Sequence, residues 1–209
     1  MARRIVQIPR NRNNRIPKEC ILVNYEGKVN KTEEIYFNNY QGREKTFYIK
    51  PIYSNVTDPL QMVEALVDYM KHQDIDTEDD YKVYCIFDTD LFPEKQSRID
   101  KAIDLARSNN IMPIVSTPCF EIWFREHFNY TSKNYNINEE LIDDLKRFIP
   151  TYKKNINIYD KIVDNTQVAI DNCKKLEKEQ LENGNKLNNV QCNPYTSVYK
   201  LVEYLINKG

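Results

Sequence analysis

Residues 81–90 read YKVYCIFDTD, and this stretch decides the fold. Residues 81–87 form a short, mainly apolar and β-rich run of the length of one strand. An apolar run that does not alternate with polar residues is typical of a strand covered on both faces, as in a parallel sheet. Asp88 and Asp90 follow at once, so the sequence predicts a central strand with two carboxylates at its carboxyl end.

Two further apolar runs resemble this one and end in polar residues. Residues 20–25 (CILVNY) stop at Glu26-Gly27, and residues 111–115 lead into Ser116-Thr117-Pro118. A fourth β-rich run covers residues 46–53, in which Pro51 favours an edge position or a bulge because proline cannot donate to a strand ladder. We therefore expect four strands before residue 118.

Helical segments lie between these strands. Residues 32–40 predict a short helix with Thr32 as N-cap, Asp58-Pro59 is a strong helix start, and Pro93 opens a helix that runs to about Asn109. Alternation of strands and helices predicts a parallel, doubly wound sheet with right-handed crossovers. The fold class is thus α/β.

The rest of the chain has a different character. From Cys119 onward, helical periodicity dominates, in the segments 119–129, about 138–149, 158–183 and 196–206. No glycine-rich linker separates this half from the strands. At the other end, residues 1–18 contain six basic residues and no acidic one. The expected organisation is a basic arm over 1–18 and a single domain over 19–209, a parallel sheet flanked by helices with a mostly helical C-terminal half.

Composition excludes several classes of protein. The chain of 209 residues is 41% hydrophobic and 29% charged with a formal net charge of -1, which is ordinary for a globular protein. Five cysteines without a CxxC pair predict buried free thiols in a reducing compartment and argue against structural zinc. No apolar stretch approaches the roughly 20 residues that cross a bilayer. We expect a cytoplasmic protein without a membrane partner.

Acidic residues follow two of the predicted strands. Ligands of open α/β sheets bind at the carboxyl ends of the strands, where Glu26, Asp88 and Asp90 would meet. On an extended chain the side chains of Asp88 and Asp90 would point the same way, with Cα atoms roughly 6.5–7 Å apart. Carboxylates suit Mg²⁺ or Mn²⁺, which prefer oxygen ligands. The alternative is that the DxD motif only forms a turn held by aspartate hydrogen bonds.

An aromatic cluster follows the last of these strands. Phe120, Trp123, Phe124 and His127 recur at helical spacing and predict core packing. Glu121 falls in the first turn of that helix, beside the predicted edge of the sheet. There it could serve as a second metal ligand or general base, or it could simply stabilise the helix dipole.

Several blocks of sequence from about residue 20 onward are similar to those of a known family: Glu26-Gly27 with Thr32-Glu33 and Tyr36-Phe37, Phe87-Asp88-Thr89-Asp90, residues 116–123 (STPCFEIW) with His127-Phe128, and Asn193-Pro194 with Thr196, Val198 and Leu201-Val202. This pattern resembles the RloB-like family, which is counted with the TOPRIM-fold proteins. The segment 28–31 is two residues longer than the usual family spacing, and Tyr195 stands where a serine is usual.

The resemblance implies a TOPRIM-like fold and a Mg²⁺-dependent nuclease-like site with Glu26, Asp88 and Asp90 as metal ligands. It also implies a role in bacterial defence against phage or foreign DNA, often beside a partner ATPase. The leading hypothesis is therefore a nuclease that hydrolyses RNA or DNA, in which Glu26 also transfers protons and Glu121 assists.

Several basic residues are predicted to bind the nucleic acid. Lys28 and Lys31 near the site, together with the arm residues, would contact phosphates: Arg3, Arg4, Arg10, Arg12 and Arg15. The arm could equally be a solvated terminus. A second hypothesis is a non-catalytic metal- or nucleotide-binding sensor or toxin subunit that works with an ATPase. Assembly into a homo-oligomer is compatible with either hypothesis.

Overall fold

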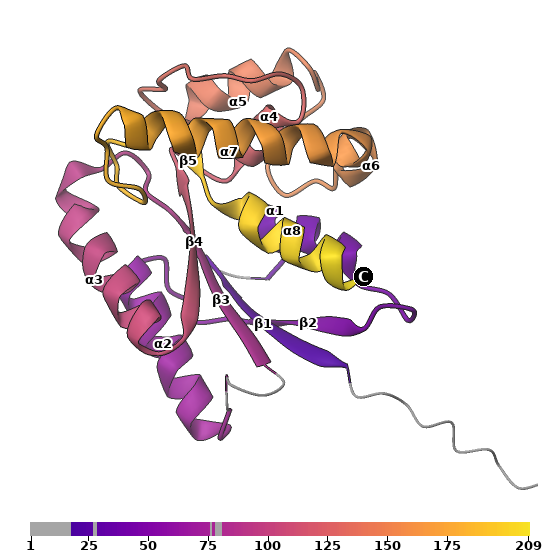
Figure 1. Ribbon diagram of the computed structural model, residues 1–209, viewed down its shortest axis with the longest axis vertical. Helices are drawn as coiled ribbons and strands as arrows, with labels where there is room; N and C mark the ends of the chain where they lie inside the picture. Colours follow the sequence, from indigo (N-terminus) through magenta and orange to yellow (C-terminus); the bar gives the residue numbers. More distant parts are fainter. Residues whose placement is uncertain (1–17, 27–28, 76, 78–80) are drawn as a thin grey trace, which may run out of the picture.

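The computed structural model describes residues 18–26, 29–75, 77 and 81–209. Its centre is a sheet with the strand order β2-β1-β3-β4-β5, drawn in Figure 1. The first four strands are mutually parallel, and the fifth is antiparallel to its neighbour β4. The strands are β1 (Glu19–Tyr25), β2 (Phe47–Ile52), β3 (Tyr81–Asp88), β4 (Ile111–Thr117) and β5 (Tyr195–Thr196). The prediction of an α/β fold is confirmed, and the predicted parallel pairing holds for β1 to β4 but not for the antiparallel β5.

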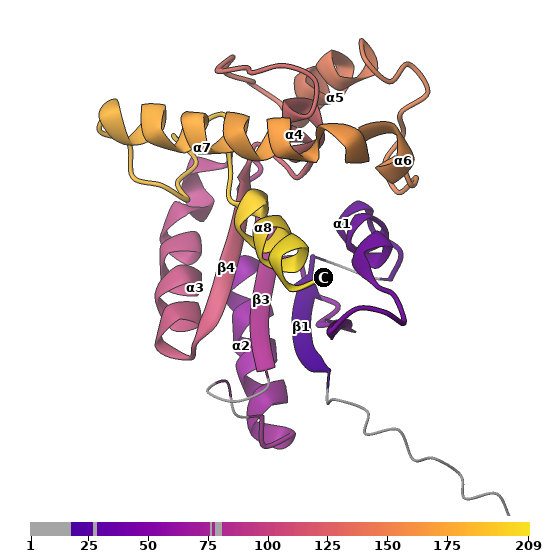
Figure 2. The same cartoon turned by 45° about the vertical axis from the view of Figure 1, so that its right-hand side comes forward.

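Helices cover both faces of the sheet (Figures 1 and 2). On one face, α2 (Pro59–His72) and α3 (Gln96–Ser108) pack on strand residues such as Leu22 and Cys85. On the other face, α1 (Thr32–Phe37) and α8 (Val198–Lys208) pack on residues such as Ile21. Alternate residues of buried strands point to opposite faces, which is why the apolar runs of β1 and β3 are almost continuous.

The C-terminal half is mostly helical, as predicted, but its longest expected helix is divided. The segment 158–183 forms a short helix, a 3₁₀ turn over Val163–Asn165 and then a long helix. The helices of this half besides α8 are α4 (Glu121–Glu126), α5 (Asn138–Lys146), α6 (Tyr159–Ile162) and α7 (Thr166–Glu182). Further 3₁₀ turns cover Asn38–Tyr40, after α1, and Pro93–Lys95, before α3.

The strand predictions hold at the positions that matter for the site. β1, β3 and β4 begin and end within two residues of the predicted runs. β2 lies at the edge of the sheet, where Pro51 faces Val23 in the register. The edge position follows from the missing proline N–H. The two-residue strand β5 was not predicted, because it is too short to carry a pattern.

One of two predicted helix caps is wrong. Asp58 caps α2 as predicted, since its side chain accepts a hydrogen bond from the Gln61 N–H at 3.0 Å. The N-cap of α1 is Lys31, not Thr32, and it makes no side-chain cap bond. The Thr32 hydroxyl is engaged elsewhere, because it accepts a hydrogen bond from the backbone N–H of Asn155 at 3.0 Å.

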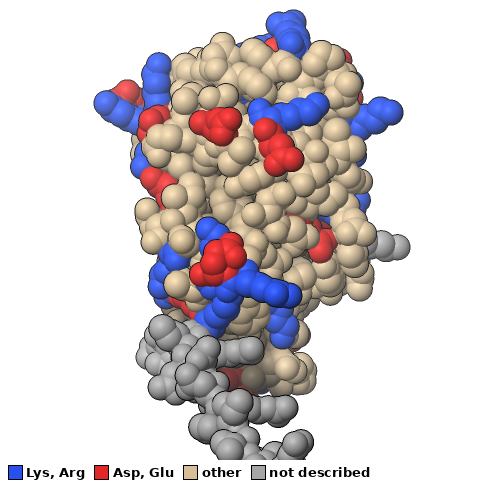
Figure 3. All heavy atoms as spheres, turned by 90° about the vertical axis from the view of Figure 1, so that its right-hand side faces the viewer, with Lys and Arg blue, Asp and Glu red and all other residues tan. Residues whose placement is uncertain are grey.

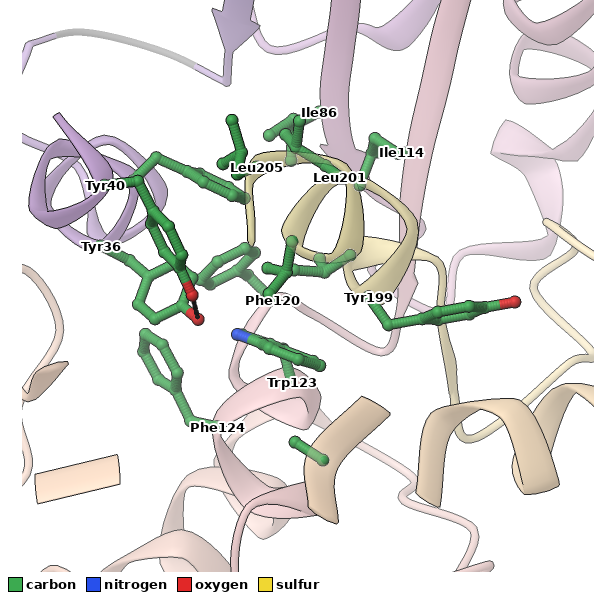
Figure 4. Close-up of a cluster of buried hydrophobic side chains, with 14 of the residues drawn as sticks. Tyr36, Tyr40, Ile86, Ile114, Phe120, Trp123, Phe124, Tyr199, Leu201 and Leu205 are labelled. Atoms are coloured by element: carbon green, nitrogen blue, oxygen red, sulfur yellow. Dashed lines mark hydrogen bonds between the residues drawn. The ribbon is translucent and has the colours of Figure 1, made fainter. Parts of the chain in front are cut away.

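The aromatic cluster is a core, as predicted. Phe120 and Trp123 are fully buried and Phe124 almost so, and they pack around Tyr36 of α1 (Figure 4). His127 is also buried, and its Nδ1 lies 2.8 Å from the Trp123 carbonyl oxygen. These contacts join the N-terminal half of the chain to α4 and so fix where α4 begins.

Two expectations from composition can be compared with the structure. All five cysteines are buried and free, as predicted. Among the described residues, none of the helices combines the length and the apolarity that crossing a membrane requires.

Candidate functional site

The strand order creates a natural ligand-binding position between β1 and β3. The chain passes from β1 to β2 on one side, whereas β3 and β4 extend the sheet on the other side. Crossovers that leave in opposite directions open a crevice at the carboxyl ends of the two strands. A pocket of about 170 Å³ occupies this position. Its lining residues are Glu26, Lys31, Thr32, Glu33, Thr57, Asp88, Asp90, Glu121, Lys154 and Asn155, and we call it the acidic pocket.

The four acids singled out from the sequence meet in this pocket. Glu26 directly follows β1, and Asp88 is the last residue of the neighbouring strand β3. Asp90 lies two residues beyond Asp88, and Glu121 is the first residue of α4. Parallel strands bring their carboxyl ends to one edge, which is why residues more than 60 positions apart line one pocket.

The DxD segment differs from the extended geometry that we predicted. β3 ends at Asp88, and Asp90 and Leu91 have left-handed backbones with φ values of 52° and 56°. Thr89 between the two acids is fully buried, and its hydroxyl donates to Thr117 Oγ1 at 3.2 Å. The chain therefore turns directly after β3. The two carboxylates reach the same pocket through this turn and not through a shared strand face.

Asp90 already has partners within the protein. Its Oδ2 accepts a hydrogen bond from Lys95 Nζ at 3.2 Å, and its Oδ1 accepts one from Asn138 Nδ2 at 3.2 Å. Lys95 comes from the 3₁₀ turn before α3, and Asn138 is the first residue of α5. Asp90 thus links the sheet edge to both neighbouring helical segments.

Glu121 is held deeper in the protein. Its side chain is 2% exposed, and Oε1 accepts a hydrogen bond from the Tyr152 hydroxyl at 2.9 Å. Tyr152 is itself buried in the aromatic core. The orientation of Glu121 toward the pocket is therefore fixed by packing of the helical half.

The crowding of carboxylates disfavours their ionised forms. Burial, and then the charge of Asp90, raises the pKa of Glu26 to about 7, although a backbone hydrogen bond at Asp88 acts in the opposite direction. Burial also raises the pKa of Glu33 to about 7, with further contributions from Glu121 and Glu26. For Asp88, burial and the charge of Glu33 raise the pKa well above its ordinary value. A pocket of this kind gains stability from any bound cation.

Two charged pocket residues were not assigned to the site from the sequence. Glu33 is the second residue of α1, and Lys154 lies in the loop between α5 and α6. Burial alone would lower the pKa of Lys154, but the charges of Glu121 and other acids raise it on balance. Glu33 could have been found from the sequence, because Thr32-Glu33 is one of the blocks that carry the family resemblance. No local signal marked Lys154, because its position depends on how a distant loop docks.

The ligand atoms of the acidic pocket are of the type that a hard divalent cation prefers, but the side chains are not positioned to share one ion. Every acidic lining residue offers carboxylate oxygens, the ligands that Mg²⁺ and Mn²⁺ prefer. Within the part of the chain that the structure describes, no three Asp, Glu, His or Cys side chains are placed to hold one metal ion together. Asp90 bonds to Lys95 and Asn138 instead.

The predicted phosphate contacts are only partly covered by the structure. Lys31 lines the acidic pocket. Lys28 lies outside the described residues, and so do the five arginines of the arm, namely Arg3, Arg4, Arg10, Arg12 and Arg15. Lys18, the first described residue, donates to the carbonyl oxygens of Gly42 and Arg43.

A larger cavity lies elsewhere. It measures about 690 Å³ and opens at the amino ends of β3 and β4, beside Tyr81, Met112 and Asn188. Its described lining includes lysine, arginine and uncharged residues but no carboxylate. Size alone does not define a site, and the convergence of titratable groups from several elements favours the smaller acidic pocket.

A mostly parallel α/β sheet with a polar pocket at its switch point defines a broad class of ligand-binding proteins. The family model of the RloB-like proteins matches residues 21–205, so this chain belongs to the RloB-like family. No curated protein and no solved structure is significantly similar to the chain. The resemblance inferred from the sequence is confirmed at the level of the family.

Proposed function

We propose that this protein is a nuclease of TOPRIM type that uses Mg²⁺ or Mn²⁺ to hydrolyse phosphodiester bonds of RNA or DNA. One observation carries the proposal. Glu26, Asp88 and Asp90 come from two neighbouring strands and line the same pocket at the carboxyl edge of the sheet. Membership of the RloB-like family adds support, because the resemblance counts that family with the TOPRIM-fold proteins, whose signature is a glutamate after one strand and a DxD after a later one.

Each pocket acid has a proposed role. Glu26, Asp88 and Asp90 would hold the ion, which would polarise the phosphoryl group and stabilise charge on the reacting oxygens. Glu26 also transfers a proton during attack by water. Glu121 lies close to these groups and is oriented by the Tyr152 hydroxyl, which suits a helper in metal binding or proton transfer.

The test is cleavage of single-stranded, duplex and transfer-RNA substrates during titration with Mg²⁺ or Mn²⁺. We expect metal-dependent cleavage by the wild-type protein and none by the Asp88→Ala/Asp90→Ala double variant. Asp143→Ala is the matched control, because that carboxylate is 73% exposed and lies on α5 outside the pocket. Cleavage at the wild-type rate by the double variant would defeat the proposal, since the proposed ligands would be gone.

A second function is favoured by a specific observation. Asp90 is bonded to Lys95 and Asn138, and the described acids do not form a ready metal site. Without a ready catalytic metal site among the described residues, the arrangement suits a non-catalytic sensor or toxin subunit beside a partner ATPase, which would bind a metal or nucleotide without turnover. Calorimetry that detects tight binding without turnover, even after addition of the ATPase, would favour this second function.

The wider biological role is proposed from the family. We infer a cytoplasmic protein that acts in bacterial defence against phage, with an ATPase encoded nearby. Phage plating on cells that carry both genes, compared with cells that carry the Asp88→Ala/Asp90→Ala variant, tests this role. Equal plating on the two strains would contradict it.

A further inference from the structure

The acidic pocket poses an electrostatic problem for the proposed substrate. Five carboxylates line it, from Glu26, Glu33, Asp88, Asp90 and Glu121, whereas a phosphodiester is itself an anion. Bound metal ions offset part of this repulsion, but the protein must also attract the phosphate. The face shown in Figure 3 carries basic side chains in separate groups interspersed with acidic ones and not in one continuous band. Cations at the pocket itself therefore become important.

Two of the described lining residues are cationic, Lys31 and Lys154. Lys31 precedes α1 and was expected near the site from the sequence. Lys154 comes from the helical half of the chain, 128 positions after Glu26. The acids that follow the strands all come from the N-terminal half. It brings a positive charge to the mouth of the pocket, where its side chain remains exposed.

The position of Lys154 is fixed by the residue that follows it. The backbone N–H of Asn155 donates to Thr32 Oγ1 at 3.0 Å, and the Thr32 hydroxyl donates to Asn155 Oδ1 at 3.3 Å. Thr32 is 5% exposed, so the hydroxyl side of this part-buried pair of bonds lies inside the protein. Asn155 has a left-handed backbone with φ of 63°, a conformation that asparagine tolerates better than most residues. The loop is thereby joined to the first residue of α1, next to Glu33.

Lys154 is close to the carboxylates without being locked to one of them. Although the charges of Glu121, Asp88 and Glu33 act on it, no carboxylate among the described residues lies within 4.0 Å of its Nζ. A lysine that only neutralised the pocket would be expected to form a direct ion pair, as Lys95 does with Asp90. The Lys154 ammonium retains its three donors for a ligand.

We propose that Lys154 binds a non-bridging oxygen of the substrate phosphodiester at the mouth of the acidic pocket. This inference rests on the proposed nuclease function and adds a substrate-binding residue to it. The helical half thus contributes the cation, the sheet contributes the acids, and the Thr32–Asn155 hydrogen bonds set the distance between them.

The test measures binding of a fluorescent single-stranded oligonucleotide by anisotropy, with Ca²⁺ in place of Mg²⁺ to prevent turnover. Loss of a hydrogen bond to a charged group predicts that Lys154→Ala weakens binding by about 10- to 100-fold. Lys154→Arg keeps the charge and should stay within about threefold of the wild type. Lys153→Ala is the matched control, because Lys153 is the exposed neighbouring residue and does not line the pocket.

An uncharged phosphate analogue shows which phosphate of the oligonucleotide Lys154 contacts. Replacing single phosphates of the oligonucleotide by uncharged methylphosphonates should, at one position, weaken binding by the wild type but not weaken binding by Lys154→Ala any further. Calorimetric titration should show that Lys154→Ala binds Ca²⁺ at least as tightly as the wild type does, since a nearby positive charge has been removed.

The outcomes separate the two proposals. If the wild type binds no oligonucleotide in the presence of divalent ions, the nuclease function fails and this inference fails with it. If the wild type binds and Lys154→Ala binds equally well, only the inference about Lys154 is overturned. Weakened Ca²⁺ binding by Lys154→Ala would also overturn it, because Lys154 would then act by maintaining the pocket.

Discussion

Glu26 and Glu33 both have a pKa of about 7, so near neutral pH each is only partly ionised in the metal-free pocket. A carboxylate must lose its proton before it can bind a metal ion, so protons and Mg²⁺ compete for these groups. We expect Mg²⁺ affinity to rise with pH through the range around 7, where Glu26 and Glu33 lose their protons. Calorimetry in buffers of different ionisation enthalpy should detect more protons released on binding at pH 6 than at pH 8.5.

The Glu33→Gln variant provides the control for this pH dependence. It removes one titrating group that we do not assign as a primary ligand, so it should release fewer protons at pH 6. Affinity that is flat from pH 5.5 to 8 would show that these carboxylates do not take part in metal binding.

Glu126 is a second titrating residue, outside the acidic pocket. It is fully buried, and neither carboxylate oxygen makes a hydrogen bond of normal geometry within the described residues. Burial raises its pKa to about 8, although the charge of Arg125 and the backbone of Thr131 act in the opposite direction. The folded protein therefore holds a proton that the unfolded chain releases above its ordinary pKa of about 4.5.

This proton makes the free energy of unfolding fall as pH rises from about 4.5 to 8, by at most about 1.4 kcal/mol per pH unit. The Glu126→Gln variant lacks the proton, so it should come closest to the wild type at pH 4 and exceed it in stability at pH 8.5. Urea unfolding at both pH values measures the difference. The exposed Glu139 offers a matched control, and Glu139→Gln should behave as the wild type does at each pH.

At the scale of single residues, the sequence allowed part of the pocket to be predicted. Glu26, Asp88 and Asp90 follow apolar runs, and the rule that parallel strands end at one edge places them together. Glu121 could be predicted for the same reason, since α4 begins just beyond β4. Lys154 could not, because its place depends on a tertiary hydrogen bond with Thr32. The turn at Asp90 was raised only as the alternative to an extended DxD, and its left-handed backbone was not foreseen because the local sequence carries no glycine.

At the scale of elements, one buried ion pair joins α4 to α5. Arg125 Nε lies 2.7 Å from Asp144 Oδ2, and both side chains are less than 10% exposed. The Tyr135 hydroxyl donates to the same oxygen at 2.9 Å, and the guanidinium lies over the Phe148 ring. Because α4 carries Glu121, this pair also supports one wall of the acidic pocket.

Asp144→Ala should therefore be strongly destabilising. It leaves the buried Arg125 charge without its partner, which typically costs about 3–5 kcal/mol. Denaturant unfolding measures the loss, and the adjacent exposed residue provides the control, since Asp143→Ala should cost less than about 0.5 kcal/mol. A loss below about 1 kcal/mol for Asp144→Ala would mean that the pair is not a structural link between the helices.

The positions of the main strands and helices were easier to predict than where each one begins, ends or is interrupted. β1, β3 and β4 were found because continuous apolar runs leave little choice of structure. β5 escaped prediction because it exists only through pairing with Ser116 and Thr117, supported by the Ser116–Thr196 hydroxyl bond of 2.9 Å. The same pairing gives the segment around Tyr195 a structural role that the sequence left open. The Thr32 cap was wrong because that hydroxyl bonds across the fold.

At the scale of the whole molecule, the sheet and the helical half share one hydrophobic cluster. Residues of β1 and β3 pack in it together with α4, α7 and α8, for example Ile21, Trp123, Ile170 and Leu201. We therefore propose that residues 19–209 unfold as one unit. Far-UV circular dichroism and Trp123 fluorescence should give coincident denaturation curves. Two separate transitions would show instead that the helical half is an independent domain.

The last helix has a consequence for how the protein is made. α8 covers one face of the sheet, and its end is tied to the beginning of β1, where the Tyr204 hydroxyl donates to Glu19 Oε1 at 2.6 Å and Lys208 pairs with Glu19. A ribosome delivers β1 to β4 long before it delivers α8. Until then the apolar side chains beneath α8 have no cover, so the nascent chain depends on chaperones or on rapid synthesis, and translation products that stop before residue 198 should accumulate as insoluble material.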